Sequence, residues 1–111
     1  MGGVLIAEII HGFGAAAARL VAAGLDGVEL VASHGYLPSQ CLNPRTNLRT
    51  DEWGGDATGR LRFLREALAA CRAATDPGFV VGLRISIGEV TPEGRDARIR
   101  PRLSVARRAG E

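Results

Sequence analysis

Four residues have the types and spacing to do chemistry, and two of them are charges inside apolar runs. Glu29 lies in the run 28–32 and Arg84 in the run 79–86. A buried charge is costly unless it is paired or meets a ligand. Glu29 and Arg84 therefore either pair with each other across neighbouring strands, or Arg84 faces an electron-rich ligand that accepts charge-assisted hydrogen bonds.

The other two residues are an imidazole and a phenol, His34 and Tyr36, which follow directly after the first of these runs. Tyr36 has the chemistry to deliver a proton to a carbon atom, and His34 to hold a substrate or cofactor oxygen. The alternative is that both have structural roles, as most loop His and Tyr residues do. His11 falls within a helical pattern, and we expect it at the surface or at an interface.

A helix and a strand on each side of a long connection are needed to position these residues. Apolar residues recur at three- and four-residue steps from Ile6 to Leu20, which predicts a helix that stops at Gly24. The runs 28–32 and 79–86 have strand length and no alternation, which is typical of strands buried on both faces.

A second helix is predicted before the second strand. Its apolar stripe runs from Leu61 to Cys71, with Asp56 or Thr58 as the N-cap and an end between residues 74 and 76. The connection 33–56 is long, and long loops in compact domains tend to be functional. Helix, strand, loop, helix and strand in this order indicate an α/β fold with parallel strands.

Composition limits the class of protein. The chain has 111 residues, of which 46% are hydrophobic and 23% charged, as in one soluble globular domain. Membrane, collagen-like and disordered classes are excluded on this basis. We find no secretory signal and no apolar stretch approaching a membrane span, which favours the cytoplasm and no membrane partner. A complete (β/α)₈ barrel needs roughly 250 residues, so this chain would form only part of such a barrel.

The cysteines and the arginines indicate no further site. Cys41 and Cys71 are too few and too far apart for a metal or iron–sulfur cluster, and we expect buried small hydrophobic residues and no metal. Arginines crowd the stretch 91–111, and Pro101 interrupts any helix there. A poorly formed terminal helix is favoured over a nucleic-acid-binding arm, because no aromatic residues are interleaved.

The connection carries a resemblance to a known family. Its residues are similar to those of the NADH:flavin oxidoreductases, which include Old Yellow Enzymes, dienoyl-CoA reductases and trimethylamine dehydrogenase. The similarity covers nearly all of residues 4–94. It rests on His34 to Pro44 (HGYLPSQCLNP), Asn47 to Gly55 (NLRTDEWGG), Arg60 to Phe63 (RLRF), Ala23 to Glu29 (AGLDGVE) and Val81 to Ser86 (VGLRIS).

The resemblance implies a fold and cofactors. The fold is a partial (β/α)₈ TIM barrel with parallel strands, about the third to fifth β/α units. Residues 1–111 then form a single barrel segment, with 95–111 degraded or a terminal helix. The implied cofactors are FMN and, as reductant, NADH or NADPH, acting on a small-molecule substrate. Any iron–sulfur cluster of the parent lies outside this chain.

The resemblance also implies roles for individual residues. His34 matches the second member of the family's His-x-x-His/Asn pair beside the flavin and substrate, and Tyr36 matches the proton-donor Tyr. Arg84 matches the Arg that contacts the pyrimidine side of FMN. The segment 49–55 matches a structural loop, and Arg60 and Arg62 are interpreted as scaffold with it.

Two positions depart from the family pattern. Val31 occupies the first position of the His pair, so the two-donor clamp on a substrate oxygen is incomplete. An apolar residue there, together with Trp53-Gly54-Gly55-Asp56, is closer to the dienoyl-CoA reductase and amine dehydrogenase branch. Gly59 replaces the usual Asn before Arg60.

Two functional hypotheses follow. In the first, the chain is a fragment of an FMN-dependent NAD(P)H oxidoreductase, ene-reductase or dienoyl-CoA reductase-like, that passes hydride through flavin to an activated alkene or related substrate. The chain alone would be inactive. In the alternative, it is a truncated, inactive remnant or a half-barrel that needs a partner chain, because open sheet edges invite self-association.

Overall fold

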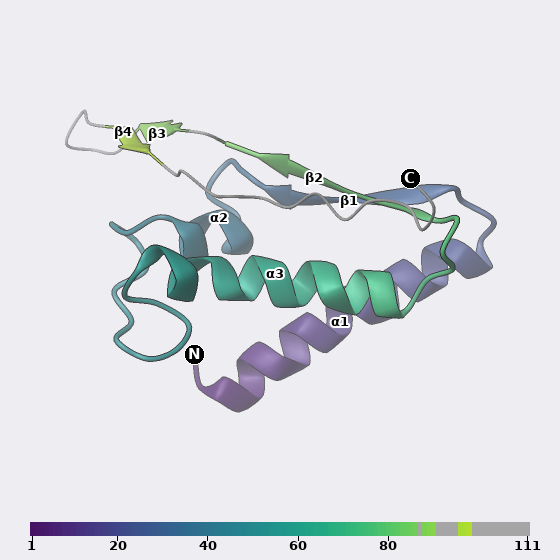
Figure 1. The fold of residues 1–111 in the computed structure, drawn as a ribbon, viewed down its shortest axis with the longest axis horizontal. Coiled ribbons are helices and arrows are strands. Elements are labelled where there is room, and N and C mark those ends of the chain that lie inside the picture. Colours follow the sequence, from purple (N-terminus) through teal and green to yellow (C-terminus); the bar gives the residue numbers. More distant parts are fainter. Residues whose placement is uncertain (87, 91–95, 99–111) are drawn as a thin grey trace. The chain divides into compact units, whose positions relative to one another are not determined.

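The computed structural model describes residues 1–86, 88–90 and 96–98. Figure 1 shows the elements in chain order: α1 (Gly3–Ala22), β1 (Gly27–Ala32), α2 (Leu37–Leu42), α3 (Ala57–Ala73), β2 (Val80–Ile85), β3 (Gly88–Val90) and β4 (Asp96–Arg98). Within the described residues the chain forms two compact units. Unit 1 comprises 1–30 and 65–82, and unit 2 comprises 31–64 and the described part of 83–103.

Helix α1 belongs to unit 1 and ends as its sequence predicts. Gly24 has a φ of 83°, a left-handed conformation that glycine adopts without steric cost. Its backbone N–H donates to Val21 O at 3.0 Å, and that of Leu25 donates to Leu20 O at 3.1 Å. This pair of bonds is the Schellman motif, which satisfies carbonyl groups that the end of the helix leaves unpaired.

A close helix contact forms in the same unit. A Cβ atom at Gly14 would lie 3.1 Å from Ala70 O, so the absence of a side chain allows the backbone of α1 to approach α3. Cys71 beside it is 1% exposed, and its Sγ lies 3.6 Å from Phe13 O. Cys71 is thus the buried small hydrophobic residue that the sequence predicts, and Cys41 is half-buried.

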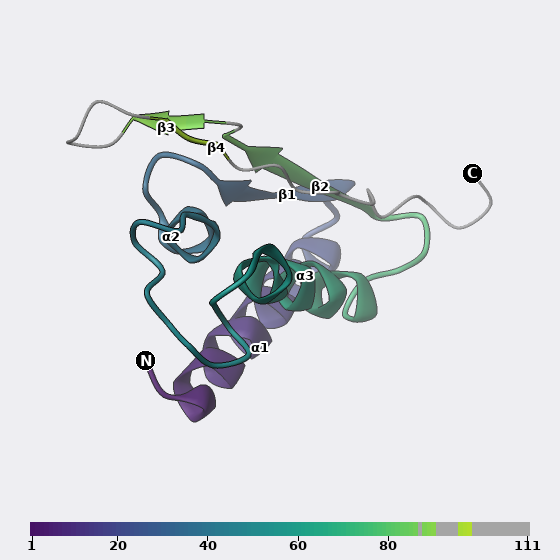
Figure 2. The same ribbon diagram turned by 60° about the vertical axis from the view of Figure 1, so that its left-hand side comes forward.

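The strands β1 and β2 lie side by side in both ribbon views (Figures 1 and 2). Val80 N donates to Asp26 O at 2.9 Å, and Ser86 N donates to Ala32 O at 3.3 Å. The sequence offset is the same at both ends, which requires parallel strands. Gly27 lies opposite Val80, where a Cβ atom would come within 2.9 Å of the Val80 Cβ. The predicted parallel pairing is confirmed.

The prediction that these strands are buried on both faces is wrong. Along β1, Glu29 and Val31 are exposed while Leu30 and Ala32 are buried, and on β2 Arg84 is exposed. Parallel strands become buried on both faces only when a second layer covers them, and among the described residues one face has no such cover. Both charged side chains are therefore exposed instead of buried.

Unit 2 contains the first part of the predicted second helix, α3, and one helix that the sequence did not predict. Asp56 is the N-cap of α3, because its Oδ1 accepts a hydrogen bond from Gly59 N at 2.8 Å. Helix α2 lies inside the segment interpreted as a loop, with Pro38 in its first turn. Leu42 of α2 is buried, as are Phe63 and Leu64 of α3.

Strands β3 and β4 form an antiparallel pair in which Glu89 lies opposite Ala97 (Figure 2). The sequence predicts that residues 95–111 are either degraded or a terminal helix, and the segment Asp96–Arg98 is a strand and not a helix. Backbone pairing with β3 supplies hydrogen-bond partners that local sequence does not reveal. The rest of the predicted helix, 99–111, lies outside the described residues.

Helix α1 also corrects an expectation about membranes. Its 20 residues are long and apolar enough to span a membrane by length and composition. This is weak evidence, because helices from the cores of soluble proteins and signal sequences pass the same test. His11 on this helix is exposed, as expected.

Candidate functional site

A tight turn joins β1 to α2 and carries both predicted catalytic residues. Tyr36 N donates to Ser33 O at 3.2 Å, and the two residues between them, His34 and Gly35, have φ angles of 57° and 73°. Two successive positive φ angles are characteristic of a type I′ turn. His34 is the one non-glycine residue with positive φ in the described part of the chain. The predicted site therefore contains a strained backbone.

The imidazole of His34 is exposed but held on one side. Its Nδ1 lies 2.8 Å from the Oγ of Ser33, which is 2% exposed. This contact orients the ring and leaves Nε2 on its other side. The sequence analysis did not single out Ser33, although a hydroxyl next to a histidine at a strand end is a signal that could have found it.

Tyr36 lies at the start of α2 with its side chain in solvent, 64% exposed. Its carbonyl oxygen accepts the first hydrogen bond of that helix, from Gln40 N at 2.9 Å. The Gln40 side-chain amide donates to Gly35 O at 2.6 Å. The backbone under the phenol is thus held at two points while the phenol remains accessible.

Arg84 lies near the carboxyl end of β2, in the same unit as the turn. The parallel register places Arg84 opposite Val31, so the two residues share one face of the sheet. His34 follows Val31 by three residues. The structure thus has the turn and Arg84 at the carboxyl ends of the two parallel strands, where catalytic loops of α/β folds lie. The individual roles of His34, Tyr36 and Arg84 stay predictions.

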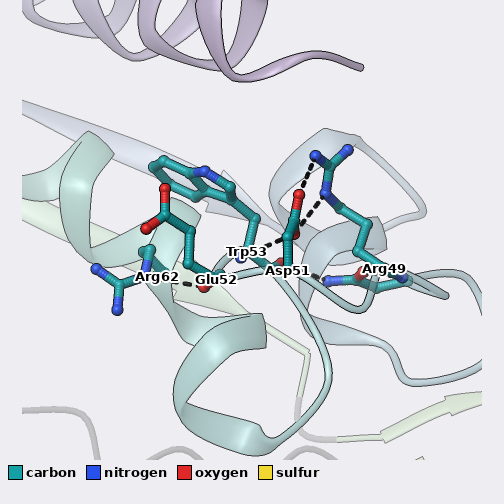
Figure 3. A network of polar contacts seen from close by, with 6 residues as sticks. Arg49, Asp51, Glu52, Trp53 and Arg62 are labelled. Carbon is teal, nitrogen blue, oxygen red and sulfur yellow. Dashed lines mark hydrogen bonds and ion pairs between the residues drawn. The ribbon is translucent and has the colours of Figure 1, made fainter.

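The loop after α2 has a different character, because its side chains bind its own backbone. Figure 3 shows part of this network. Asn47 Nδ2 donates to Cys41 O at 2.7 Å and to Trp53 O at 3.0 Å, while its Oδ1 accepts from Arg49 N at 3.2 Å. The side-chain amide of Asn47 therefore links the backbone at Cys41, Arg49 and Trp53. Sequence reasoning gave Asn47 no role of its own.

Three arginines support this loop. Arg62 Nε donates to Glu52 O at 2.9 Å, as Figure 3 shows. Arg60 donates through Nε to Leu42 O at 3.1 Å and through Nη1 to Gly55 O at 2.8 Å. These contacts agree with the interpretation of Arg60 and Arg62 as scaffold, since their donors are directed at carbonyl oxygens of the same unit.

The third arginine, Arg49, forms a two-point ion pair with Asp51. Arg49 Nε lies 3.0 Å from Asp51 Oδ1, and Nη2 lies 2.6 Å from Oδ2. These hydrogen bonds lower the pKa of the Asp51 carboxyl and raise that of the Arg49 guanidinium. Burial raises the pKa of the Cys41 thiol, and the charge of Arg49 lowers it by less.

Neither cysteine has the setting of a reactive thiol. Burial also raises the pKa of the Cys71 thiol, so both cysteines favour the less nucleophilic thiol form. In the described part of the chain, His, Cys, Asp and Glu side chains form no group of three that could hold a metal ion.

Comparison with known proteins finds a matching family and similar sequences. A family model described as NADH:flavin oxidoreductase / NADH oxidase matches residues 2–99. The chain is 51% identical over 89 residues to an NADH-dependent flavin oxidoreductase of Aspergillus parasiticus, covering 80% of this chain and 20% of that protein. It is 46% identical over 87 residues to the N,N-dimethylglycine/sarcosine dehydrogenase of Chromohalobacter salexigens, covering 78% and 12%.

Two solved structures of similar fold match the chain. A 6-hydroxypseudooxynicotine amine oxidase from Pseudomonas geniculata matches with a TM-score of 0.75 at 32% identity, over 78% of this chain and 13% of that one. Morphinone reductase in complex with tetrahydroNAD matches with a TM-score of 0.69 at 36% identity, over 75% and 23%. These neighbours are TIM-barrel flavin oxidoreductases, so the fold is a partial (β/α)₈ barrel. The chain spans only about an eighth to a quarter of these proteins.

Proposed function

Because the chain belongs to the NADH:flavin oxidoreductase / NADH oxidase family, we propose that it supplies one wall of the flavin and substrate site of an FMN-dependent NAD(P)H oxidoreductase. One observation carries the proposal. Unit 2 has an arginine, an imidazole and a phenol, all exposed, at the carboxyl ends of its two parallel strands. A small-molecule substrate would bind there.

The residues present fit an isoalloxazine ring. Arg84 offers a guanidinium, which suits the carbonyl and ring-nitrogen acceptors on the pyrimidine side of FMN. His34 offers a second polar contact from the adjacent turn. FMN, when bound, supplies hydride transfer from NADH or NADPH to the substrate, and the protein supplies binding and orientation.

Two side chains of the turn complete the proposed chemistry. Tyr36 would donate its phenolic proton to the substrate carbon next to the one that is reduced, and its exposure leaves it accessible for this. His34 would hold a substrate oxygen or a flavin carbonyl in position. Both residues are placed by one short turn, so their spacing depends on few backbone angles.

Val31 supports a substrate other than a simple enone. It is exposed on the face that it shares with Arg84, where the resemblance leads us to expect the first member of a histidine pair. One hydrogen-bond donor is therefore missing from a two-donor clamp. We propose an activated alkene or related substrate of the dienoyl-CoA reductase or amine dehydrogenase branch. The relatives include a dimethylglycine/sarcosine dehydrogenase. With an amine substrate, hydride would pass from the substrate to the flavin, and Tyr36 would not donate a proton to carbon.

A second candidate is supported by exposed apolar side chains. In unit 1, Val4 is 78% exposed, and Leu5 and Leu25 are also exposed. Large apolar residues left in water favour association, as does an uncovered sheet face. In this alternative the chain is an inactive remnant, or a half-barrel that works only with a complementing chain. For both candidates we propose the cytoplasm as the compartment, with neither a nucleic acid nor a membrane as partner.

Flavin titration tests the first proposal. FMN fluorescence should be quenched by the chain, and Arg84→Ala should weaken binding by roughly ten-fold or more, because hydrogen bonds to charged groups contribute about 1.5–3 kcal/mol. Arg65→Ala, which removes an exposed arginine of α3, is the matched control and should bind FMN normally.

The absence of quenching at high micromolar protein would contradict FMN binding by the chain alone and would favour the half-barrel alternative. Size-exclusion chromatography then decides between the two forms of that alternative. A compact monomer would count against self-association, whereas a dimer or larger species would support it.

A further inference from the structure

Ser33 and His34 form a pair that the proposed function does not require. Ser33 is the last residue before the turn and is 2% exposed, whereas His34 is exposed. The Ser33 Oγ and the His34 Nδ1 are 2.8 Å apart, a hydrogen-bond distance. A buried hydroxyl thus contacts one nitrogen of an exposed imidazole and leaves the other nitrogen for a ligand.

The backbone of the turn makes this contact possible. In an extended strand, adjacent side chains point to opposite faces, so neighbours cannot meet. His34 instead has a φ of 57°, which moves its side chain away from the alternating pattern of β1. A non-glycine residue in a sparsely populated backbone conformation destabilises the fold. The hydroxyl contact offsets part of that destabilisation.

The direction of the hydrogen bond between Ser33 and His34 follows from the requirement that a buried hydroxyl group should donate. A buried O–H group that donates no hydrogen bond destabilises the folded chain. Within the described residues, Nδ1 of His34 is the acceptor that the structure gives the Ser33 hydroxyl. If Ser33 donates, Nδ1 carries no proton in the neutral ring, and the proton must be on Nε2.

We infer that Ser33 is a positioning residue for His34: its buried hydroxyl donates to Nδ1, selects the Nε2–H tautomer and so presents a hydrogen-bond donor at the exposed side of the ring. A donor is what a substrate oxygen or a flavin carbonyl needs. Only the identity of this acceptor rests on the proposed function; the tautomer is a property of the chain alone.

Nitrogen NMR of the uniformly ¹⁵N-labelled chain tests the inference without a ligand. The spectra are recorded about two pH units above the ordinary histidine pKa of about 6.5, where imidazoles are neutral. His34 should show one pyridine-like and one pyrrole-like nitrogen, with the proton on Nε2. His11, exposed on α1, is the internal reference and should show the averaged signals of two exchanging tautomers.

Three variants test whether the hydroxyl group of Ser33, and not the packing of its side chain, determines the tautomer of His34. Ser33→Ala should shift His34 towards the averaged signals of His11, while Ser33→Thr, which keeps a hydroxyl, should retain the Nε2–H pattern. Ser39→Ala removes another buried hydroxyl from unit 2 and should leave His34 unchanged. Amide spectra show whether each variant is folded.

A proton on Nδ1 in the unmodified chain would overturn the inference, even if no variant folds. An unchanged His34 in Ser33→Ala would also overturn it, as would loss of the pattern in both Ser33 variants. FMN binding is a separate result. A chain with the Nε2–H pattern that does not bind FMN contradicts FMN binding by the chain alone and leaves the role of Ser33 intact.

Discussion

Two segments of unit 2 use polar side chains in opposite ways. In the loop 47–55, Asn47 binds the loop's backbone, Arg49 binds Asp51, and Arg60 and Arg62 of α3 bind its carbonyl oxygens. In the turn 33–36, the phenol is in solvent and the imidazole has one nitrogen held and the other available. Both segments resemble the same family, but the loop's polar side chains bind its own backbone, whereas the side chains of His34 and Tyr36 are exposed.

The difference shows how to separate scaffold from site when residue types are alike. Arginine suits both anion binding and loop support, so its type does not decide between the two. The groups to which an arginine donates hydrogen bonds indicate whether it supports a loop. Arg60 and Arg62 donate to backbone carbonyls, which identifies them as support for the loop. Arg84 lies near the end of its strand, on the face that it shares with Val31.

The largest effect that this comparison predicts is at Tyr36. In an active enzyme assembled with this chain, Tyr36→Phe should slow substrate reduction by about 10²–10⁴-fold, the usual contribution of a positioned proton donor. Reduction of FMN by NADH or NADPH should not change, and stopped-flow measurement of the two half-reactions separates them. Equal slowing of both steps would show that Tyr36 is part of the scaffold.

The next effect is expected at Gly59. A Cβ atom there would overlap the backbone oxygen of Gly54, so Gly59→Asn, which restores the usual residue of the family, must displace the loop. We expect a loss of about 1–3 kcal/mol in the free energy of unfolding, measured with urea. Gly12→Ala is the control, because that glycine has open space and should gain about 0.5–1 kcal/mol. Full stability of Gly59→Asn would mean that the loop adapts.

The smallest effect is expected at the exposed Arg49–Asp51 pair. Its hydrogen bonds lower the pKa of Asp51 in the folded chain, so the pair stabilises the fold above the ordinary aspartate pKa. That contribution is lost as the pH falls through the lowered value. Asp51→Asn should therefore lower the urea midpoint slightly at neutral pH. The difference should disappear in acid and shrink in high salt. A difference independent of pH would contradict this account.

Much of the secondary structure follows from local patterns. The stripe from Ile6 to Leu20 predicts α1, and Gly24 ends it as expected because a helix terminus is a local event. Asp56 is identified as the N-cap of α3 for the same reason. Helix α2 was missed because its six residues are too few to show a periodic pattern.

The candidate site is predictable in its residues and less so in its geometry. His34, Tyr36 and Arg84 stand out by type and position, and the parallel register has them at the carboxyl ends of their strands. Ser33 and Asn47 were not singled out, because their importance lies in contacts that depend on the shape of a turn and a loop. The supposed burial of Glu29 and Arg84 was wrong, since burial depends on what covers a strand.

The sequence by itself determined helices α1 and α3, the parallel strands β1 and β2 and the family, because periodicity, caps and motif spacing are local properties of the chain. The tertiary structure decided which face of the strands is exposed, which carbonyl groups Arg60 and Arg62 bind, and that Ser33 contacts His34. These features depend on contacts between segments and on one left-handed residue, which no local pattern specifies.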